Sequence, residues 1–329
     1  MTPVKRTGLI FVAILVSMIT ITAAWMIPEA RRIQKERATR SAEQATGTDM
    51  ARLPAGGVTM GSNDGPAEEQ PLHDIKISEV WMDRTEVTNA QFARFVTATN
   101  HITTAETSRS GKPAGSWIFS PAEPWKTWMP GATWRNPEGP GSNLTGRDSH
   151  PVVHVSYDDA TAFAKWSGKR LPTEAEWEFA ARSAALITKY PWGTEATPGG
   201  RNPANTWQGT FPTTNDASDG FPRTAPVGSF AANTYGLNDL AGNVAEWCSD
   251  WFSHTYYAEL RPDPDRAAHR NPKGPDTSSD PAEPGVWKRV IRGGSWLSTG
   301  ADYRVSARAR ETPDFTAAWV GFRCVRDVK

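Results

Sequence analysis

Glycine, proline and tryptophan constrain the fold of this chain more than any other feature. The chain has 27 glycines, 26 prolines and 15 tryptophans among 329 residues. Glycine and proline interrupt helices and central strands, because glycine leaves the backbone unrestrained and proline lacks a backbone N–H. Tryptophan supplies a large apolar surface that packs between loops. This composition argues against a helical bundle and predicts a loop-rich domain whose turns are held by aromatic packing.

Charge and cysteine content exclude several classes of function. Lysine plus arginine and aspartate plus glutamate both number 36, so the formal net charge is zero. The chain therefore lacks the basic excess with which proteins bind nucleic acid, and we expect no nucleic-acid partner. Two cysteines are too few for a disulfide framework, a four-thiolate zinc site or an iron–sulfur cluster.

The N-terminal segment differs from the rest of the chain. Leu9–Ile27 contains no charged residue and is long enough to cross a bilayer. We therefore expect an N-terminal transmembrane helix within residues 1–27, although the small residues at 22–24 leave a cleaved signal open. Residues 28–48 are interpreted as a charged tether and residues 49–329 as the folded domain. Basic residues flank the apolar segment on both sides, so charge does not settle its orientation.

Three helices carry clear start signals. Thr88 precedes an apolar pattern of helical spacing that runs to about residue 99. Ser156 and Thr173 each have an acidic residue three positions later, at Asp159 and Glu176, which is the pattern of a capping box. The sequence therefore predicts helices after all three residues.

Regular structure is expected to be a minority of the domain, giving an α+β fold with long loops. One segment, Arg261–Gly285, is rich in proline, aspartate and serine and lacks apolar periodicity, so it is predicted to form a long exposed loop. The predicted strands are short: Ile75–Ile77, Val80–Met82, Val152–Val155, Val290–Arg292 and Gly321–Val325.

A series of sequence blocks resembles a known family. They include LPAGGVTMGS (53–62), MDRTEVTNAQFARFV (82–96), HPVVHVSYDDA (150–160), GKRLPTEAEWEFAAR (168–182), YGLNDLAGNVAEW (235–247), IRGGSW (291–296) and GFRCV (321–325). In this order, over about residues 50–326, they resemble the formylglycine-generating enzyme, or sulfatase-modifying factor, family. The resemblance implies a compact variant of the C-type-lectin-like fold with little regular secondary structure. It also implies export, with the domain extracytoplasmic, and periplasmic in a bacterium.

The residues that hold copper in active members of this family are missing. The active enzymes oxidise a substrate cysteine of a sulfatase to formylglycine with oxygen, using copper held by two cysteines shortly after the GGS motif. Here Ser298 stands at the first position, and the second falls within Gly300–Asp302. Copper(I) selects soft thiolate ligands, which a serine hydroxyl does not replace. We therefore expect no bound copper and no formylglycine synthesis by the copper–dithiolate route.

The resemblance places the same segment at the substrate groove of the family. Arginine and aspartate there could form charge-assisted hydrogen bonds to a ligand, and tryptophan could supply a stacking surface. Alternatively, Arg304 and Arg308 are structural charges paired with carboxylates such as Glu246 or Asp314. Ala245, where many members carry tryptophan, is expected to open space beside the groove. The expected groove residues are Ser295, Trp296, Ser298, Asp302, Arg304 and Arg308.

The resemblance also implies two structural calcium sites. The expected ligands of the first are Asn205, the carbonyl of Thr206, Asp219 and the carbonyl of Phe221. The expected ligands of the second are Asp239, the carbonyls of Gly242 and Val244, and Glu246. Carboxylate, amide and backbone oxygens in tight loops suit this hard cation. Without the resemblance, Asp239 and Glu246 would be interpreted as ordinary turn and cap residues.

Cys248 and Cys324 are interpreted as two buried free thiols, with a disulfide between them as the alternative. His150 and His154 belong to no metal-binding motif, and we interpret both as structural hydrogen-bonding residues.

Three functions remain open at this point. The first is a membrane-anchored accessory or assembly subunit that binds a protein, peptide or small molecule in the groove. The second is an oxidoreductase with non-copper chemistry on a small molecule, since cysteine-less relatives are implicated in oxidative tailoring of siderophores. Its candidates for proton transfer are Asp302, Tyr303 and Glu246. The third is oxidation of a sulfatase cysteine to formylglycine by another mechanism.

Overall fold

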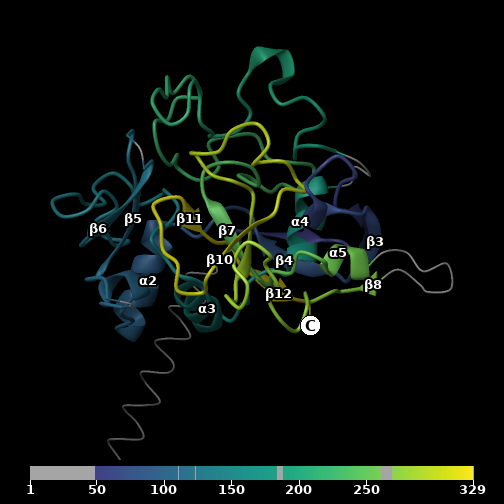
Figure 1. The fold of residues 1–329 in the computed structure, drawn as a ribbon, viewed down its shortest axis with the longest axis horizontal. Helices are drawn as coiled ribbons and strands as arrows, with labels where there is room; N and C mark the ends of the chain where they lie inside the picture. The colour runs from purple at the N-terminus through teal and green to yellow at the C-terminus, as the bar shows by residue number, and fades with distance from the viewer. Residues whose placement is uncertain (1–48, 110, 123, 184–187, 261–268, 329) are drawn as a thin grey trace, which may run out of the picture.

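The structure is a computed structural model that describes residues 49–109, 111–122, 124–183, 188–260 and 269–328. Within these ranges it is a mixed α and β domain with short elements and long connections, as the composition predicts (Figure 1). The hairpin β5–β6 and helix α2 lie at one side of the molecule, and β3, β8 and α5 lie at the other.

The central sheet has the strand order β10–β9–β7–β11. Strands β7 (Ala245–Trp251) and β9 (Arg289–Arg292) pair antiparallel, and β10 (Ala309–Glu311) pairs antiparallel with β9. The short β11 (Val320–Gly321) runs parallel to β7. This sheet matters for function because its strands contribute to the walls of the groove described below.

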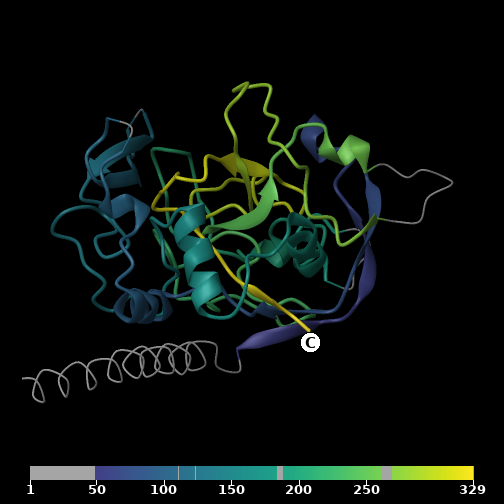
Figure 2. The same cartoon turned by 90° about the horizontal axis from the view of Figure 1, so that it is seen from below.

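A second sheet joins the two ends of the described chain. Strand β4 (Val80–Asp83) lies between β1 (Met50–Leu53) and β12 (Val325–Asp327), and both pairings are antiparallel. Figure 2 shows the C-terminal end beside the purple N-terminal strands, in agreement with this pairing. The first and last strands of the described chain therefore both pair with β4.

Two smaller sheets complete the β structure of the described residues. Strand β3 (His73–Ile77) pairs antiparallel with β2 (Gly56–Met60) and parallel with β8 (His269–Arg270). Strands β5 (Gly115–Phe119) and β6 (Lys126–Pro130) form an antiparallel hairpin.

The segment Arg261–Gly285, predicted as an exposed loop, is only partly so. Residues 261–268 lie outside the described part of the chain. Beyond them, β8 joins a sheet, and Asp280 is buried, with its carboxylate bonded by Lys288 and Arg310. The prediction was wrong at these positions because β8 pairs with β3, which lies far away in sequence, and because Asp280 accepts a hydrogen bond from Arg310, 30 residues away.

The three predicted N-caps are confirmed. Thr88, Ser156 and Thr173 each accept a hydrogen bond from the backbone N–H three residues later, and each is part of a capping box. They begin the helices α2 (Asn89–Thr99), α3 (Tyr157–Trp166) and α4 (Glu174–Arg182). The remaining helical elements are short: α5 (Tyr256–Glu259), η1 (Ala67–Glu69), η2 (Thr104–Glu106) and η3 (Pro198–Gly200).

The predicted strand Val152–Val155 does not form. The N–H of Val152 donates to the carbonyl of Val87, whereas the N–H of His154 donates to the carbonyl of Ala317. His154 has a φ of 60°, which a strand does not accommodate. The apolar residues are buried as expected, but in an irregular segment. The predicted strand Gly321–Val325 is likewise divided between the ends of β11 and β12.

His154 has the structural role that the sequence predicts. Its buried ring lies 2.8 Å from the hydroxyl of Ser116 through Nδ1 and 2.9 Å from the carbonyl of Pro137 through Nε2. Burial lowers the pKa of this histidine to about 4, so the ring is neutral at pH 7.

Beside two smaller clusters, two large apolar clusters form most of the core of the described residues. One surrounds α4 and includes Trp177 and Phe179, and the other lies between α2, α3 and the central sheet. In the second cluster the ring of Phe92 packs edge-on against Trp134 at 5.3 Å and stacks on Phe163 at 6.0 Å. Aromatic packing therefore holds the long connections in place, as the tryptophan content predicts.

In the described part of the chain, no helix has the length and apolar character needed to span a bilayer. Leu9–Ile27 lies outside the described residues, so the transmembrane helix, and with it the boundaries at residues 27 and 48, stay predictions.

Candidate functional site

A cavity of about 480 Å³ lies where the sequence places the groove. It is bordered by η1, by strands of the central sheet and by the segment that follows β9. Ala245 is among its lining residues, as predicted. Five of the six expected groove residues also line it: Ser295, Ser298, Asp302, Arg304 and Arg308.

Trp296, the sixth expected groove residue, does not line the cavity. Its side chain is buried, and its indole N–H donates to the carbonyl of Ala318 at 3.2 Å. The ring packs edge-on against Phe119 at 5.6 Å. Trp296 therefore supports the cavity wall and presents no stacking surface to a ligand, which corrects the expectation from sequence.

Arg304 is paired inside the protein. Its two terminal nitrogens donate to the two carboxylate oxygens of Glu69, at 2.7 and 2.8 Å. A further hydrogen bond of 2.9 Å reaches the hydroxyl of Ser306, and Nε donates to the carbonyl of Ala301. This arginine is largely saturated by internal acceptors.

Arg308 is held in the same way. Nε and Nη2 donate to the two carboxylate oxygens of Glu174, at 2.7 and 2.9 Å, while Nη1 donates to the carbonyls of Glu68 and Ser253. The alternative of structural, paired arginines thus holds for both residues. Their partners are Glu69 and Glu174 rather than Glu246 or Asp314.

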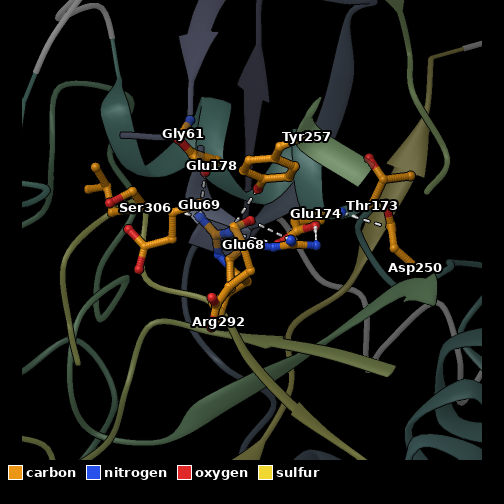
Figure 3. Close-up of polar contacts among 12 residues, drawn as sticks. Gly61, Glu68, Glu69, Thr173, Glu174, Glu178, Asp250, Tyr257, Arg292 and Ser306 are labelled. Atoms are coloured by element: carbon orange, nitrogen blue, oxygen red, sulfur yellow. Dashed lines mark hydrogen bonds and ion pairs between the residues drawn. The ribbon is translucent and has the colours of Figure 1, made fainter. Parts of the chain in front are cut away.

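A buried ion network lies beneath the groove (Figure 3). Arg292 donates to Glu174 at 2.7 Å and to Glu178 at 2.5 Å, and all three side chains are almost completely buried. Burial acts to raise the pKa of Glu174, but Arg308 and Arg292 outweigh it and lower that pKa. The network therefore holds charged groups at neutral pH and makes a rigid floor.

The carboxylates of Asp302 and Glu311 are the acidic groups of the cavity that remain available. Asp302 is exposed and accepts only local hydrogen bonds from Thr299, the shorter at 3.2 Å. Glu311 is half-buried, and no residue in the described ranges forms a hydrogen bond or ion pair with its carboxylate. Burial raises the pKa of Glu311, and Lys126 acts against that rise.

Aromatic side chains form one wall of the cavity. Trp125 packs against Phe211 at 5.6 Å and against Trp319 at 5.4 Å, and Phe315 lies 6.4 Å from Trp319. All four rings are half-buried and line the cavity. The sequence analysis did not assign them to the groove, because Trp125 and Phe211 come from segments far from the GGS motif.

The three candidates for proton transfer do not share one site. Asp302 lines the cavity, but Tyr303 is buried against Tyr190, with ring centres 5.5 Å apart. Glu246 is buried elsewhere, in a two-pronged ion pair with Arg323. The geometry therefore offers no constellation for acid–base chemistry among these residues.

No thiol faces the groove. Ser298 Oγ, at the first expected copper position, accepts a hydrogen bond of 2.9 Å from the N–H of Ser295. Cys248 and Cys324, the only cysteines of the sequence, are both free and fully buried. Burial raises both thiol pKa values well above the ordinary value, so neither cysteine is a ready thiolate.

The residues expected at the first calcium site fit a cation. Asn205 donates through Nδ2 to the carbonyl of Arg223 and to Oδ1 of Asn243, while its own buried Oδ1 has no hydrogen-bond partner among the described residues. Asp219 accepts from the N–H groups of Thr206 and Phe221, and burial raises its pKa. An unpaired amide oxygen near a half-buried carboxylate suits Ca²⁺.

The second expected site fits less well. Both carboxylate oxygens of Glu246 are occupied by Arg323, at 2.7 Å each, and one also accepts from the indole of Trp177. Asp239 accepts from the N–H of Gly228. The described residues contain no group of three or more His, Cys, Asp or Glu side chains placed to hold a metal. Any cation here would therefore need amide and carbonyl oxygens as well.

A larger cavity, of about 590 Å³, lies between α3, α4 and the turn before β4 and shares no lining residue with the groove. Its principal charges are paired internally. Arg170 donates to both oxygens of Glu176 and to Asp327, and Lys169 donates to Asp83. The Arg170 pairs tie β12 to α4, and the Lys169 pair reaches β4.

Comparison with known proteins agrees with the resemblance. The model of the sulfatase-modifying factor enzyme 1-like domain matches residues 35–328. A formylglycine-generating enzyme of Streptomyces coelicolor is 48% identical over 294 residues, covering 84% of this chain and 89% of the relative. The inactive C-alpha-formylglycine-generating enzyme 2 of Mus musculus is 36% identical over 299 residues, covering 84% of each.

Among solved structures, PvdO from Pseudomonas aeruginosa superposes with a TM-score of 0.58 at 26% identity, covering 85% of this chain and 94% of that protein. The family model covers most of the chain, and the two relatives and the solved structure each cover 84–85% of it. The chain therefore belongs to the sulfatase-modifying factor enzyme 1-like family, which includes both formylglycine-generating enzymes and an inactive relative.

Proposed function

We propose that this protein is a binding member of the family, which holds a peptide segment of a protein partner in its groove as an accessory or assembly subunit. The observation that carries the proposal is a complete groove without thiols. Ser298 stands where a copper ligand is expected, and both cysteines are buried elsewhere. A hydroxyl does not supply the soft ligand or the redox chemistry of a thiolate.

The charges of the groove indicate the kind of peptide. Arg304 and Arg308 are saturated by Glu69 and Glu174, so they offer little to an anionic ligand. Asp302 and Glu311 retain free carboxylate oxygens. Beside them stands the wall formed by Trp125, Phe211, Phe315 and Trp319, whose rings suit apolar and cationic side chains. A peptide with basic and apolar residues fits this combination best.

The proposal includes a location. Leu9–Ile27 would anchor the protein in a membrane, with residues 28–48 as tether and the domain on the extracytoplasmic side. A groove that recognises peptide segments next to a membrane suits a subunit that assists exported partners.

Calcium is part of the proposal as a structural ion. Asn205, Asp219 and the carbonyls of Thr206 and Phe221 would hold it at the first site. When bound, the ion would tie together loops that have little secondary structure of their own.

Copper titration tests the loss of the family's chemistry. The full-length protein in detergent is titrated with Cu(I) against a competing chelator, and a CxPxR-type peptide is assayed for conversion of cysteine to formylglycine by mass spectrometry. We expect no stoichiometric copper and no conversion. One tightly bound copper per chain together with oxygen-dependent conversion would refute the proposal.

A peptide-binding assay tests the second part of the proposal, that the groove binds a basic peptide. A peptide array with matched members, in which each lysine or arginine is replaced by glutamine, is probed with the same protein. We expect binding to basic members and at least a tenfold loss on replacement. Equal binding to basic and neutral members would contradict the assignment of the ligand.

A further inference from the structure

The hairpin β5–β6 carries three tryptophans that are only partly covered. Trp117 and Trp128 lie directly opposite each other on the two strands, and their rings meet nearly at right angles with centres 5.7 Å apart. Trp125 immediately precedes β6. All three side chains are half-buried, so the hairpin presents aromatic surface to the solvent.

Two lysines lie over these rings. Nζ of Lys112 is 4.3 Å from the ring centre of Trp117 and 4.8 Å from that of Trp128. Nζ of Lys126 is 5.7 Å from the ring centre of Trp117 and 5.5 Å from that of Trp125. The negative face of an aromatic ring attracts a cation, so these contacts restrict where each ammonium group lies. Lys112, Lys126 and the three tryptophans are called the hairpin strip below.

The two ammonium groups lack an anionic partner. No carboxylate in the described ranges forms an ion pair or hydrogen bond with Lys112 or Lys126. The neighbouring Arg109 is occupied, by contrast, because it lies 3.6 Å from a carboxylate oxygen of Asp314 and donates to the hydroxyl of Thr316. Each lysine therefore keeps N–H donors that an external anion can use.

The hairpin strip continues into the groove. Trp125 belongs to both, since it also packs against Trp319 in the cavity wall. Backbone hydrogen bonds hold β5 to the segment that leads to Trp319. The N–H of Trp117 donates to the carbonyl of Thr316 at 3.2 Å, and the N–H of Ala318 donates to the carbonyl of Trp117 at 3.0 Å. The hairpin and the groove wall thus form one connected surface.

The two parts of this surface have opposite charge. The groove offers the carboxylates of Asp302 and Glu311, whereas the hairpin strip offers the ammonium groups of Lys112 and Lys126. The charge changes sign between Glu311 and Lys126, which is near enough to act against the rise in the Glu311 pKa that burial causes. A polyanion such as nucleic acid would be repelled in the groove, and a uniformly basic peptide would be repelled at the strip.

We propose that the partner peptide carries an acidic segment next to its basic and apolar segment, and that the hairpin strip binds the acidic segment. This assignment rests on the proposed function, because it extends the same groove. In an extended peptide, residues two positions apart face the same side, about 7 Å from each other. Lys112 and Lys126 both contact the ring of Trp117, so two acidic residues at that spacing can reach both lysines.

Three fluorescent peptides test this assignment with the full-length protein in detergent. All contain a seven-residue core of alternating lysine and leucine, and two of them add Glu-Gly-Glu after a two-glycine spacer, one at each end of the core. In fluorescence anisotropy at low ionic strength, one extended peptide should bind about tenfold more tightly than the core, because one end points toward the hairpin. The gain should shrink at 1 M salt, which screens exposed charges. An equal gain for both extended peptides, or for neither, would overturn the assignment.

A matched pair of variants locates the effect. Lys112→Gln should lose most of the gain and bind the core with unchanged affinity, because Lys112 does not line the groove. Lys112→Arg keeps the positive charge and should keep the gain. A full gain in Lys112→Gln, or the same loss in both variants, would contradict a role for the charge of Lys112.

The core peptide separates this result from the proposed function. Binding of the core without a gain from either extension would refute the acidic segment and leave the groove proposal standing. Binding of one extended peptide that depends on Lys112, without binding of the core, would refute the basic preference of the groove alone. Absence of binding by all three peptides would refute both. An oligothymidylate that binds more tightly than the extended peptides would show that the strip does not serve a peptide.

Discussion

Arg308 and Glu174, 134 residues apart in sequence, form a buried two-pronged ion pair that joins the wall of the groove to the first turn of α4. Glu174 also accepts from Arg292, so one carboxylate serves two guanidinium groups. The groove is therefore built on the same charges that stabilise the interior.

Glu174→Gln should strongly destabilise the domain. The change removes the negative charge that compensates Arg308 and Arg292, and breaking a buried ion pair from one side costs about 3–5 kcal/mol. The free energy of unfolding from denaturant titration measures the loss. Glu195→Gln, at an exposed position, is the control and should change that free energy by less than about 0.5 kcal/mol. Equal stability of the two variants would contradict the role of the network.

Glu311→Gln should weaken binding of a basic peptide without unfolding the protein. The glutamine keeps the size of the side chain and removes the free negative charge beside Trp319 and Phe315. We expect the dissociation constant to rise about tenfold, equivalent to about 1.4 kcal/mol, in fluorescence anisotropy. The same substitution should leave a neutral control peptide unaffected. A loss of affinity for both peptides would indicate a change of shape and not of charge.

Ala245→Trp should close part of the groove. Ala245 lines the cavity from β7, and an indole there would occupy space that a ligand needs. Peptide affinity should fall at least tenfold in calorimetric titration, whereas calcium binding should persist. Ala245→Val, with a smaller increase in volume, should have an intermediate effect. Unchanged affinity in the tryptophan variant would show that the peptide binds elsewhere.

Asp250→Asn should alter how stability depends on pH. Burial, with the nearby charge of Glu174, raises the pKa of Asp250 to about 7. A folded-state pKa above the unfolded value means that the folded protein binds this proton more tightly, so the Asp250 contribution to stability declines as pH rises from about 4 to about 7. At 1.36 kcal/mol per pKa unit, the decline is at most about 4 kcal/mol.

The asparagine variant lacks this decline. Its free energy of unfolding relative to the unaltered protein should therefore increase between pH 4 and pH 8, as measured by urea titration at each pH. A difference that stays constant over this range would show that Asp250 titrates normally in the folded protein.

The local features of the fold were predictable from sequence, because their causes lie within a few residues. Thr173 caps α4 through a residue three positions away, and the same holds for Ser156 and α3. Such hydrogen bonds require no knowledge of the distant chain. Both helices therefore begin where the capping boxes indicate.

Distant contacts limited the prediction of the site. Arg304 pairs with Glu69 across 235 residues, and no periodicity or motif connects the two. The irregular path of residues 152–155 has the same origin, since its N–H groups bond to loops far away in sequence.

The pairing of β12 with β4 also has a consequence for biosynthesis. Strand β4 lies near the beginning of the domain. One of its two neighbouring strands, β12, and Arg323, the partner of Glu246, both come from the last few residues of the domain. While the ribosome is still making the middle of the chain, Glu246 has no counter-charge and β4 has an open edge. The nascent domain would thus complete its folding only after synthesis of residues 323–327, and until then chaperones would have an unpaired strand to protect.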